Sequence, residues 1–564
     1  MAMNLFDEDS LLDNQVRDYK AAISSASAEE SWTLLEEYSR LSESLAAADL
    51  NDNVSRQQVN GIYYTSFSLA RSMVANLLDV VSKPNQTFFE PCVGGGAFLF
   101  SYIDEAFARS NRSFEELSQI INNCYIADND PKSIENLLSI CPTYFETRYG
   151  FRLDFPAANV FLGDSLLQIQ NDEVTIRSFA ETFGQVGGFD IIATNPPYKL
   201  MKKDKRRSAD AESYIDHYTR LVRKSGSFKY NSGTLNLYKL FTEAVLEKWS
   251  AKDGMIGLLI PRGLLSDIQS APLRKRILES TELQKIYNLA EGNEHFKSVG
   301  QAFTALTAQK GRRTTIVPFA APSVAENVLT DTLRIPLDFY QRLNVNLALF
   351  ELSDTEMRFL NQLTNQNSIQ ELPGLVNLRG ELDMTLDAAY ITTENTGYPL
   401  IQGSGIKPFT SIPSGLFVKN SFLNRPKGRW IHKNRIACQQ ISNMNQTNRL
   451  KWSFVPAGNV MANSCNFLAL DDTCLSGLKE EDLYKLLGLL NSQTLNNRFK
   501  LLSANNHISN QEVASLPVGN LNSTEAKRIG KLASLQISKP SLEALSEIEK
   551  LVLKHFELEQ KESL

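Results

Sequence analysis

The chain has 564 residues, too many for a single hydrophobic core, so its length predicts two or three domains. Hydrophobic residues make up 42% and charged residues 22%, as in ordinary soluble globular proteins, and the net charge is −6. Six cysteines without CxxC spacing and five scattered histidines argue against a disulfide scaffold and a metal centre. We expect a cytoplasmic protein, because no apolar run reaches the roughly 18 residues of a membrane span and the start lacks a hydrophobic signal region.

Residues 1–55 are polar, with apolar residues at helical spacing, and predict a helical packing arm without catalytic residues. An amphipathic helix is expected over residues 68–81. Thr65, Ser66 or Ser68 could cap that helix and leave free N–H groups at its start. A capped helix with no further role is the simpler interpretation.

A glycine-rich turn follows a short strand within residues 87–99. Glu90 precedes the three glycines at 94–96 and can accept a hydrogen bond from an ammonium group. Glycines let a ligand approach the backbone, but the spacing is not GxGxxG and the lysine of a P-loop is absent. Because an acid here would repel a pyrophosphate, the loop favours a cationic or zwitterionic nucleoside over a dinucleotide.

Two further strands end in acids. Residues 124–128 end at Asp128, where α/β nucleoside sites hold ribose hydroxyls, and Asp130 is expected to cap the next helix. Residues 160–165 contain Asp164, placed to accept from an adenine amino group. Strand, acid and helix, repeated three times, predict an α/β fold with a doubly wound sheet.

Residues 189–198 begin as a buried strand that stops at two prolines. Asn195 therefore lies at the carboxyl end of a strand, where open α/β sheets keep their ligands. Pro196 and Pro197 donate no N–H, so the loop presents mainly acceptors, and Tyr198 adds an aromatic face. Two acceptors beside a ring suit a planar substrate with an exocyclic amino group. The alternative is an ordinary Pro-Pro strand terminator with a packed tyrosine.

Two segments are rich in basic residues. Residues 199–229 hold ten Lys and Arg against four Asp and Glu, which indicates a polar loop that clamps nucleic acid or is merely mobile. A hinge is expected between Ala320 and Arg334. Beyond it, residues 395–470 contain no acid, while aromatic and amide side chains are interleaved with nine basic ones, which predicts contact with DNA or RNA. A merely solvated basic face would normally include acids. The nine are Lys407, Lys419, Arg425, Lys427, Arg429, Lys433, Arg435, Arg449 and Lys451.

Taken in order, these motifs resemble the N6-adenine DNA methyltransferases of type II restriction–modification systems, in the TaqI-like (gamma) motif order. The resemblance covers about residues 56–520, and no single motif carries it. Residues 90–96 look like the family's (D/E)-P-x-x-G-x-G cofactor loop, 127–131 like its ribose-binding strand end, and 195–198 like its catalytic (N/D)-P-P-(Y/F). Residues 163–164 look like its adenine contact, and 236–241 and 296–299 fit two further motifs. Ser66 stands where the family commonly has Pro, and Val93 where it has a small residue.

The resemblance implies an α/β fold: a doubly wound mixed sheet of the S-adenosylmethionine-dependent methyltransferase type, followed by a separate α+β target-recognition domain. The expected boundaries are an N-terminal helical arm over 1–55, the catalytic domain over 56–320, the target-recognition domain over 330–520 and a C-terminal helical tail over 521–564.

The implied reaction moves the methyl group of S-adenosyl-L-methionine to the N6 amino group of an adenine rotated out of duplex DNA. It would protect host DNA from a cognate restriction endonuclease on a separate chain, and the protein would act as a monomer in the bacterial cytoplasm. Asn195 rather than Ser favours adenine over cytosine N4. An inactive DNA-binding relative, or a methyltransferase acting on cytosine N4, RNA or protein glutamine, stays open.

The resemblance also assigns residues. The implied catalytic residues are Asn195, Pro196, Pro197, Tyr198 and Phe296: the Asn195 side-chain oxygen and Pro196 carbonyl accept the N6 hydrogens, while Tyr198 and Phe296 hold the base, and no metal is needed. The implied cofactor contacts are Tyr64, Thr65, Glu90, Pro91, Gly94, Gly96, Asp128, Asp164, Ser165, Asn195 and Phe241. The implied DNA contacts are Lys202, Lys203, Arg206, Arg207, Lys407, Arg425, Lys427, Arg429, Lys433, Arg435, Arg449 and Lys451.

Overall fold

The computed structural model describes residues 5–46, 65–81, 85–184, 187–202, 209–289, 302–322, 329–343, 346–443, 446–471, 477–503 and 506–559. They form two compact units, residues 1–349 and 350–564. The division falls later than the hinge expected between Ala320 and Arg334. There, β10 (Ile316–Pro322) and β11 (Leu329–Pro336) pair antiparallel and extend the sheet of the first unit. The predicted hinge is therefore wrong.

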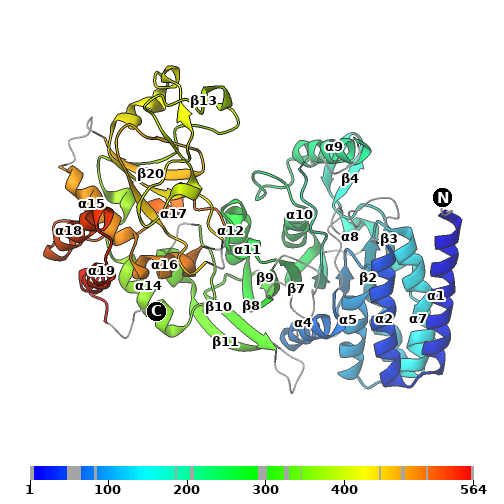
Figure 1. Ribbon diagram of the computed structural model, residues 1–564. Helices are drawn as coiled ribbons and strands as arrows, with labels where there is room; N and C mark the ends of the chain where they lie inside the picture. The colour runs from blue at the N-terminus through cyan, green and yellow to red at the C-terminus, as the bar shows by residue number, and fades with distance from the viewer. Residues whose placement is uncertain are drawn as a thin grey trace. The chain divides into compact units, whose positions relative to one another are not determined.

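The first unit is built on a mixed sheet, which has nine strands in the described part of the chain (Figure 1). The strand order is β11-β10-β8-β9-β7-β6-β1-β2-β3. Five neighbouring strands run parallel: β3, β2, β1, β6 and β7. Strand β9 lies antiparallel between β7 and β8. The predicted α/β fold with a mixed sheet is confirmed. The bounds are β1 (Phe88–Glu90), β2 (Cys124–Asp128), β3 (Val160–Leu162), β6 (Phe189–Thr194), β7 (Ser250–Pro261), β8 (Thr281–Leu289) and β9 (Phe303–Lys310); a separate hairpin joins β4 (Leu167–Gln170) and β5 (Glu173–Ile176).

The order of the strands creates one special position at the carboxyl edge of the sheet. From β1 the chain moves outward to β2 and β3, and it then returns to β6 on the other side of β1. The carboxyl ends of β1 and β6 are therefore neighbours where the direction of winding reverses. Ligands of open α/β sheets bind at such a point.

Helices cover both faces of this sheet. On one face, the Phe88 ring stacks on Tyr102 of α5 with centroids 4.4 Å apart. On the other, Phe89 packs against Phe179 of α8 and Trp249 after α10, at 4.5 and 6.0 Å. Large buried rings thus fix both helical layers on β1. The helices of this unit are α1 (Leu5–Ser25), α2 (Ala28–Ala46), α4 (Phe67–Val80), α5 (Ala97–Ala108), α6 (Phe114–Asn122), α7 (Pro131–Tyr149), α8 (Phe179–Thr182), α9 (Ala209–Ser225), α10 (Leu237–Ala244), α11 (Gly263–Ser266), α12 (Ala271–Ser280) and α13 (Leu337–Leu343).

Local sequence signals explain several helix ends. Asp130 is the N-cap of α7, as predicted: its side chain accepts from the Lys132 N–H, and Pro131 opens the first turn.

The N-terminal helices α1 and α2 lie within the predicted arm and pack on α7, forming a further layer beside it (Figure 1). Helix α9 lies inside the segment 199–229, so the prediction of a loop throughout that segment is wrong.

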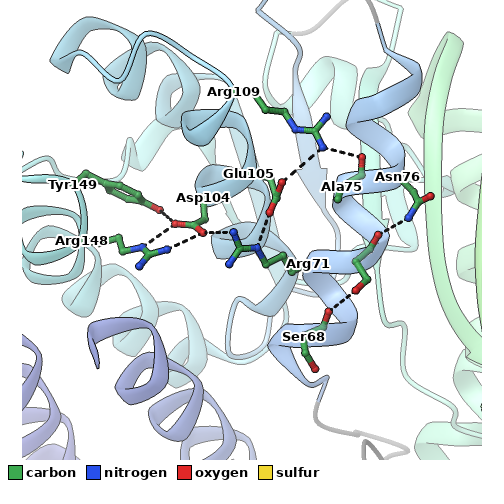
Figure 2. A network of polar contacts seen from close by, with 10 residues as sticks. Ser68, Arg71, Ala75, Asn76, Asp104, Glu105, Arg109, Arg148 and Tyr149 are labelled. Atoms are coloured by element: carbon green, nitrogen blue, oxygen red, sulfur yellow. Dashed lines mark hydrogen bonds and ion pairs between the residues drawn. The ribbon is translucent and has the colours of Figure 1, made fainter. Parts of the chain in front are cut away.

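A buried carboxylate joins three helices on the Phe88 face (Figure 2). Arg148 of α7 donates to both oxygens of Asp104 of α5, at 2.8 and 3.0 Å. Arg71 of α4 lies 3.3 Å from the same carboxylate and 2.6 Å from Glu105. The Asp104 side chain is only 5% exposed, so the paired charges compensate one another away from water.

The second unit is α+β. Its larger sheet has the order β12-β20-β17-β18-β15, in which only β15 and β18 pair parallel. In the region expected to be a C-terminal tail, α18 packs on α15, where Gly488 lies against Ile529. The strands are β12 (Leu375–Arg379), β13 (Ile391–Thr392), β14 (Leu400–Ile401), β15 (Phe409–Thr410), β16 (Phe417–Val418), β17 (Arg435–Gln439), β18 (Trp452–Val455), β19 (Val460–Met461) and β20 (Cys465–Leu470). The helices are α14 (Asp354–Thr364), α15 (Glu480–Leu490), α16 (Gln493–Leu502), α17 (Asn510–Ala514), α18 (Thr524–Ser538) and α19 (Leu542–His555).

Of the helices described in the two units, none combines the length and the apolar character needed to cross a lipid bilayer.

Replacing Asp104 by alanine is expected to lower the free energy of unfolding by about 3–5 kcal/mol, because Arg148 and Arg71 lose a shared buried partner. Urea denaturation followed by circular dichroism measures the change. Asp79→Ala is the control: Asp79 pairs with Arg109 at the surface, is 57% exposed, and should cost below about 1 kcal/mol. Equal losses for the two variants would contradict the role given to Asp104.

Candidate active site

Three acids that follow successive strands gather at the carboxyl edge of the sheet. Glu90 ends β1, Asp128 ends β2, and Asp164 lies two residues after β3. All three act on one thiol: burial raises the pKa of Cys92 well above its ordinary value, and the negative charges of Asp128, Glu90 and Asp164 raise it further. The strand ends thus bring together the acids that the sequence predicted as cofactor contacts.

A different structural reason requires glycine at each of the three positions in the loop after β1. Gly94 has a positive φ of 46° and donates its N–H to Asp128 Oδ2 at 2.9 Å. Gly96, with φ of 80°, is the N-cap of α5, and a Cβ there would lie 2.8 Å from Phe100. At Gly95 a Cβ would lie 2.0 Å from Ser39 Oγ of α2. For Gly95, room for a helix rather than for a ligand explains the absence of a side chain.

The acids of β1 and β2 are fixed by backbone N–H groups. Buried Glu90 accepts from the Leu99 N–H at 2.8 Å, in the first turn of α5. Asp128 accepts from Gly94 and, through Oδ1, from Asp130 at 3.0 Å. Burial raises the pKa of Asp128, and these N–H groups oppose that effect by stabilising the charged form. Both carboxylates therefore have set orientations.

Asp164 has a partner that the sequence interpretation missed. Tyr218 of α9 donates its hydroxyl to Asp164, with 3.2 and 3.1 Å to the two carboxylate oxygens. The Leu166 N–H donates to Oδ1 at 2.8 Å. Burial raises the pKa of Asp164, while these donors lower it. A helical repeat in the basic segment, Tyr214 and Tyr218, was the available signal, because residues four apart share one helix face.

Asn195 follows β6, beside the end of β1, and its side-chain amide is fixed at both ends. Nδ2 donates to Thr65 Oγ1 at 2.9 Å, and Oδ1 accepts from the Tyr198 hydroxyl. The same hydroxyl lies 2.9 Å from the carbonyl of Leu259 on β7. These two bonds fix the orientation of the Asn195 side chain at the carboxyl end of β6.

Two aromatic residues predicted at the site are enclosed by neighbouring rings. The Tyr198 ring is 8% exposed and packs against Phe303 and Tyr238, with centroids 5.1 and 6.2 Å away. Its hydroxyl donates to Asn195, and stacking of its ring on a base stays a prediction. Phe241 is buried too and packs edge-on against Trp249 at 5.9 Å, inside the helical layer rather than at the cofactor loop.

Other predicted residues support the loops. Ser165 Oγ donates to the Pro91 carbonyl at 2.7 Å and so ties the end of β3 to that of β1. Pro196 is buried, Pro197 is half-buried and Lys202 is exposed. Several predicted residues lie outside the described part of the chain: Tyr64, Phe296, Lys203, Arg206 and Arg207.

The basic residues of the second unit divide into a surface group and a buried pair. Arg435 and Arg449 are 0% and 1% exposed; Arg435 pairs with buried Glu381, and Arg449 donates to the Ser503 carbonyl at 3.0 Å. Because both are enclosed, the prediction that they contact DNA is wrong. Four predicted residues are exposed and two are half-buried: Lys407, Arg425, Lys427 and Arg429, then Lys433 and Lys451.

Two of the four exposed cations, both arginines, lie over aromatic rings. The Arg429 guanidinium lies 4.5 Å from the Trp430 ring centroid, and that of Arg425 lies 4.9 Å from Tyr390. Arg425 also pairs with Asp387 at 2.6 Å. This surface therefore holds its charges in place while leaving them accessible.

Comparison with known proteins assigns the segment that carries the site. Residues 62–296 match the model of the Eco57I restriction-modification methylase family. The match starts before α4 and ends after β8, so it includes the three acids and Asn195. The matched segment makes up less than half of the 564 residues. No curated protein sequence matches the chain.

Solved structures share the fold over a longer stretch. A DrdV–DNA complex is 11% identical with a TM-score of 0.56, covering 91% of this chain and 60% of its own. A nuclease-deletion mutant of the type ISP restriction-modification enzyme LlaGI, with a DNA substrate mimic, is 11% identical with a TM-score of 0.53, covering 84% and 47%. The ATP-dependent type ISP enzyme LlaBIII bound to DNA is 11% identical with a TM-score of 0.51, covering 86% and 39%. The chain thus spans 39–60% of the length of these three proteins.

Within the described ranges, no three His, Cys, Asp or Glu side chains gather in a way that could hold a metal ion. The carboxylates of Glu90, Asp128 and Asp164 at the carboxyl edge are acceptors, which suit an organic ligand that carries ammonium and amino groups.

Replacing Tyr218 by phenylalanine is expected to raise the pKa of Asp164 further, because the hydroxyl that stabilises the charged carboxylate against burial is lost. A carboxyl group whose pKa is raised in the folded state favours folding at low pH, where it is protonated. This contribution to stability is lost as the pH rises through the folded-state pKa of Asp164. The deficit of Tyr218→Phe should therefore be small near pH 4 and grow to about 1.5–3 kcal/mol at pH 8, the value of a hydrogen bond to a charged group.

Urea unfolding from pH 4 to pH 8 measures this deficit. Tyr214→Phe, one turn earlier on α9 and 53% exposed, is the matched control. In an Asp164→Asn background the pH dependence should vanish. A deficit independent of pH would show that the Tyr218 hydroxyl does not act through the charge of Asp164.

Proposed function

We propose that the chain transfers the methyl group of S-adenosylmethionine to the N6 amino group of an adenine in duplex DNA. The observation that carries the proposal is the fixed amide of Asn195 at the reversal point of the sheet, beside three acids from the neighbouring strands. The match of residues 62–296 to restriction-modification methylases supports the same reaction class.

The acids fit the proposed cofactor. Asp128 would hold ribose hydroxyls, Asp164 the adenine amino group and Glu90 the ammonium end, because each is an acceptor at the carboxyl edge. Their joint negative charge, which raises the pKa of Cys92, suits a positively charged ligand and opposes a pyrophosphate. Bound S-adenosylmethionine would supply a methyl group already activated by its sulfonium.

The chain's own residues would orient the acceptor. Asn195 Oδ1 and the Pro196 carbonyl would accept the two N6 hydrogens and so direct the amino lone pair away from the ring. Thr65 and Tyr198 hold Asn195 for this purpose, so orientation precedes the reaction. The adenine must leave the duplex, at a cost of a few kcal/mol that contacts to the extruded base offset. We propose Phe296, outside the described residues, for one such contact.

The second unit would supply DNA contacts from its exposed cations. Lys407, Lys427 and Arg429 carry charge at the surface, where phosphates bind them, and aromatic rings support the arginines. The solved complexes of DrdV, LlaGI and LlaBIII contain DNA or a DNA mimic, which supports DNA as the partner. We further propose that the protein works as a cytoplasmic monomer and protects host DNA from a separate cognate endonuclease.

Methyl transfer from labelled S-adenosylmethionine to unmethylated bacterial DNA tests the proposal. Mass analysis of the nucleosides should find the label in N6-methyladenine. Asn195→Ala should lower the rate on the order of 10²–10³-fold, the cost of removing one group aimed at charge that develops in a transition state. Cys438→Ala is the control. Cys438 is buried in the second unit, and its replacement should leave the activity near that of the wild type.

Other outcomes separate the alternatives. Label in N4-methylcytosine would keep the fold and change the substrate. Cofactor binding without label in DNA would point to RNA or protein glutamine. Loss of both would leave an inactive DNA-binding relative.

Lys407→Ala is expected to weaken DNA binding at every sequence and to reduce the slope of log K against log salt by about one, as one phosphate contact is lost. Fluorescence anisotropy with a short duplex at several salt concentrations measures the slope. Lys539→Ala, an exposed lysine at the end of α18, is the matched control. An unchanged slope for Lys407→Ala would remove this residue from the interface.

A further inference from the structure

Helix α2 is fixed against the first unit through an aromatic residue. Trp32 packs edge-on against Phe67, the first residue of α4, with ring centroids 5.1 Å apart. The guanidinium groups of Arg71 and Arg148 each lie 5.6 Å from the centre of the Trp32 ring. Arg148 also donates to the Ala28 carbonyl at 2.7 Å, at the start of α2. The helix is thus tied to the network around Asp104.

One turn along α2, Glu36 reaches the start of α4. Its Oε1 accepts from the Phe67 N–H at 3.3 Å, while the N-cap residue Ser66 makes no side-chain capping bond. A carboxylate at a helix N-terminus satisfies a free N–H and the helix dipole. Here a separate helix provides it. Thr65, two residues before Phe67, accepts a hydrogen bond from Asn195 Nδ2. Glu36 is therefore connected to the side-chain amide of Asn195 through the backbone of residues 65–67.

The next position on the same face of α2 meets the glycine loop. Trp32, Glu36 and Ser39 are spaced i, i+4 and i+7, which places them on one side of the helix. A Cβ on Gly95 would lie 2.0 Å from Ser39 Oγ, 2.9 Å from its Cβ and 3.1 Å from its Cα. Ser39 is 0% exposed, and its hydroxyl is buried without a hydrogen-bond partner. A small residue is required on each side of this contact.

We infer that α2 is a positioning element of the active site: Glu36 fixes the start of α4 and with it Asn195, and Ser39 fixes the glycine loop. The inference rests on the proposed function, since the loop and Asn195 serve cofactor and substrate there. It gives the N-terminal helices a role in the reaction beyond packing. Glu36 bonds the backbone of Phe67 and Ser39 lies against Gly95, so both act through the backbone they support.

A double-mutant cycle between Gly95 and Ser39 tests the contact with the loop. The backbone of Gly95 does not have a positive φ, so alanine fits there except for its clash with Ser39. Gly95→Ala should raise the dissociation constant for S-adenosylmethionine about tenfold or more, because the loop must move. Ser39→Gly leaves only its Cα, 3.1 Å away, so the double variant should bind within about threefold of Ser39→Gly alone.

Isothermal titration calorimetry on the full chain measures these constants, with melting temperatures recorded alongside. Rescue in the double variant supports the inference, whereas binding by Gly95→Ala equal to the wild type, or no rescue, overturns it. A wild-type chain that binds no S-adenosylmethionine overturns the proposed function as well. The two failures are therefore distinct.

Variants of Glu36 test the link to Asn195. Glu36→Ala should lower kcat at saturating cofactor and DNA about tenfold, since Asn195 loses its fixed support. Glu36→Gln keeps an oxygen that can accept from Phe67 and should restore most of kcat. Glu37→Ala, the exposed neighbour on α2, is the matched control. Equal kcat for Glu36→Ala and Glu37→Ala would overturn this part of the inference.

Discussion

A single buried carboxylate, Asp104, sets the arrangement of the helices on one face of the mixed sheet of the first unit. It binds Arg148 of α7 and Arg71 of α4 (Figure 2). Trp32 of α2 lies against both guanidinium groups. Helix α4 transmits this constraint, because Thr65, two residues before its first residue, bonds Asn195. The place of the Asn195 amide thus depends on a charge that belongs to none of the motifs.

The parts of the site that the sequence predicted are those with local causes. An apolar run that stops at Pro196 makes a strand with Asn195 at its end, and this needs no knowledge of distant residues. The acids Glu90 and Asp128 likewise end their own strands. Parallel pairing then brings these ends together, so the α/β pattern was enough to foresee which acids meet.

The errors arose where the outcome depends on distant partners. Arg435 lies in a stretch without acids, yet its partner Glu381 precedes that stretch and makes burial possible. The segment around 320–334 resembles a hinge by itself, but β10 pairs with β8, which lies earlier in the chain. Neither of these partners can be read from the neighbouring sequence.

The contact between Gly95 and Ser39 has an evolutionary consequence. Side chains at these two positions share one small space, although 55 residues separate them in the sequence. A residue larger than glycine at position 95 must be matched by a residue smaller than serine at position 39. The two positions should therefore covary among homologues, and a chimaera that exchanges the N-terminal helices should function only if the glycine loop is exchanged with them.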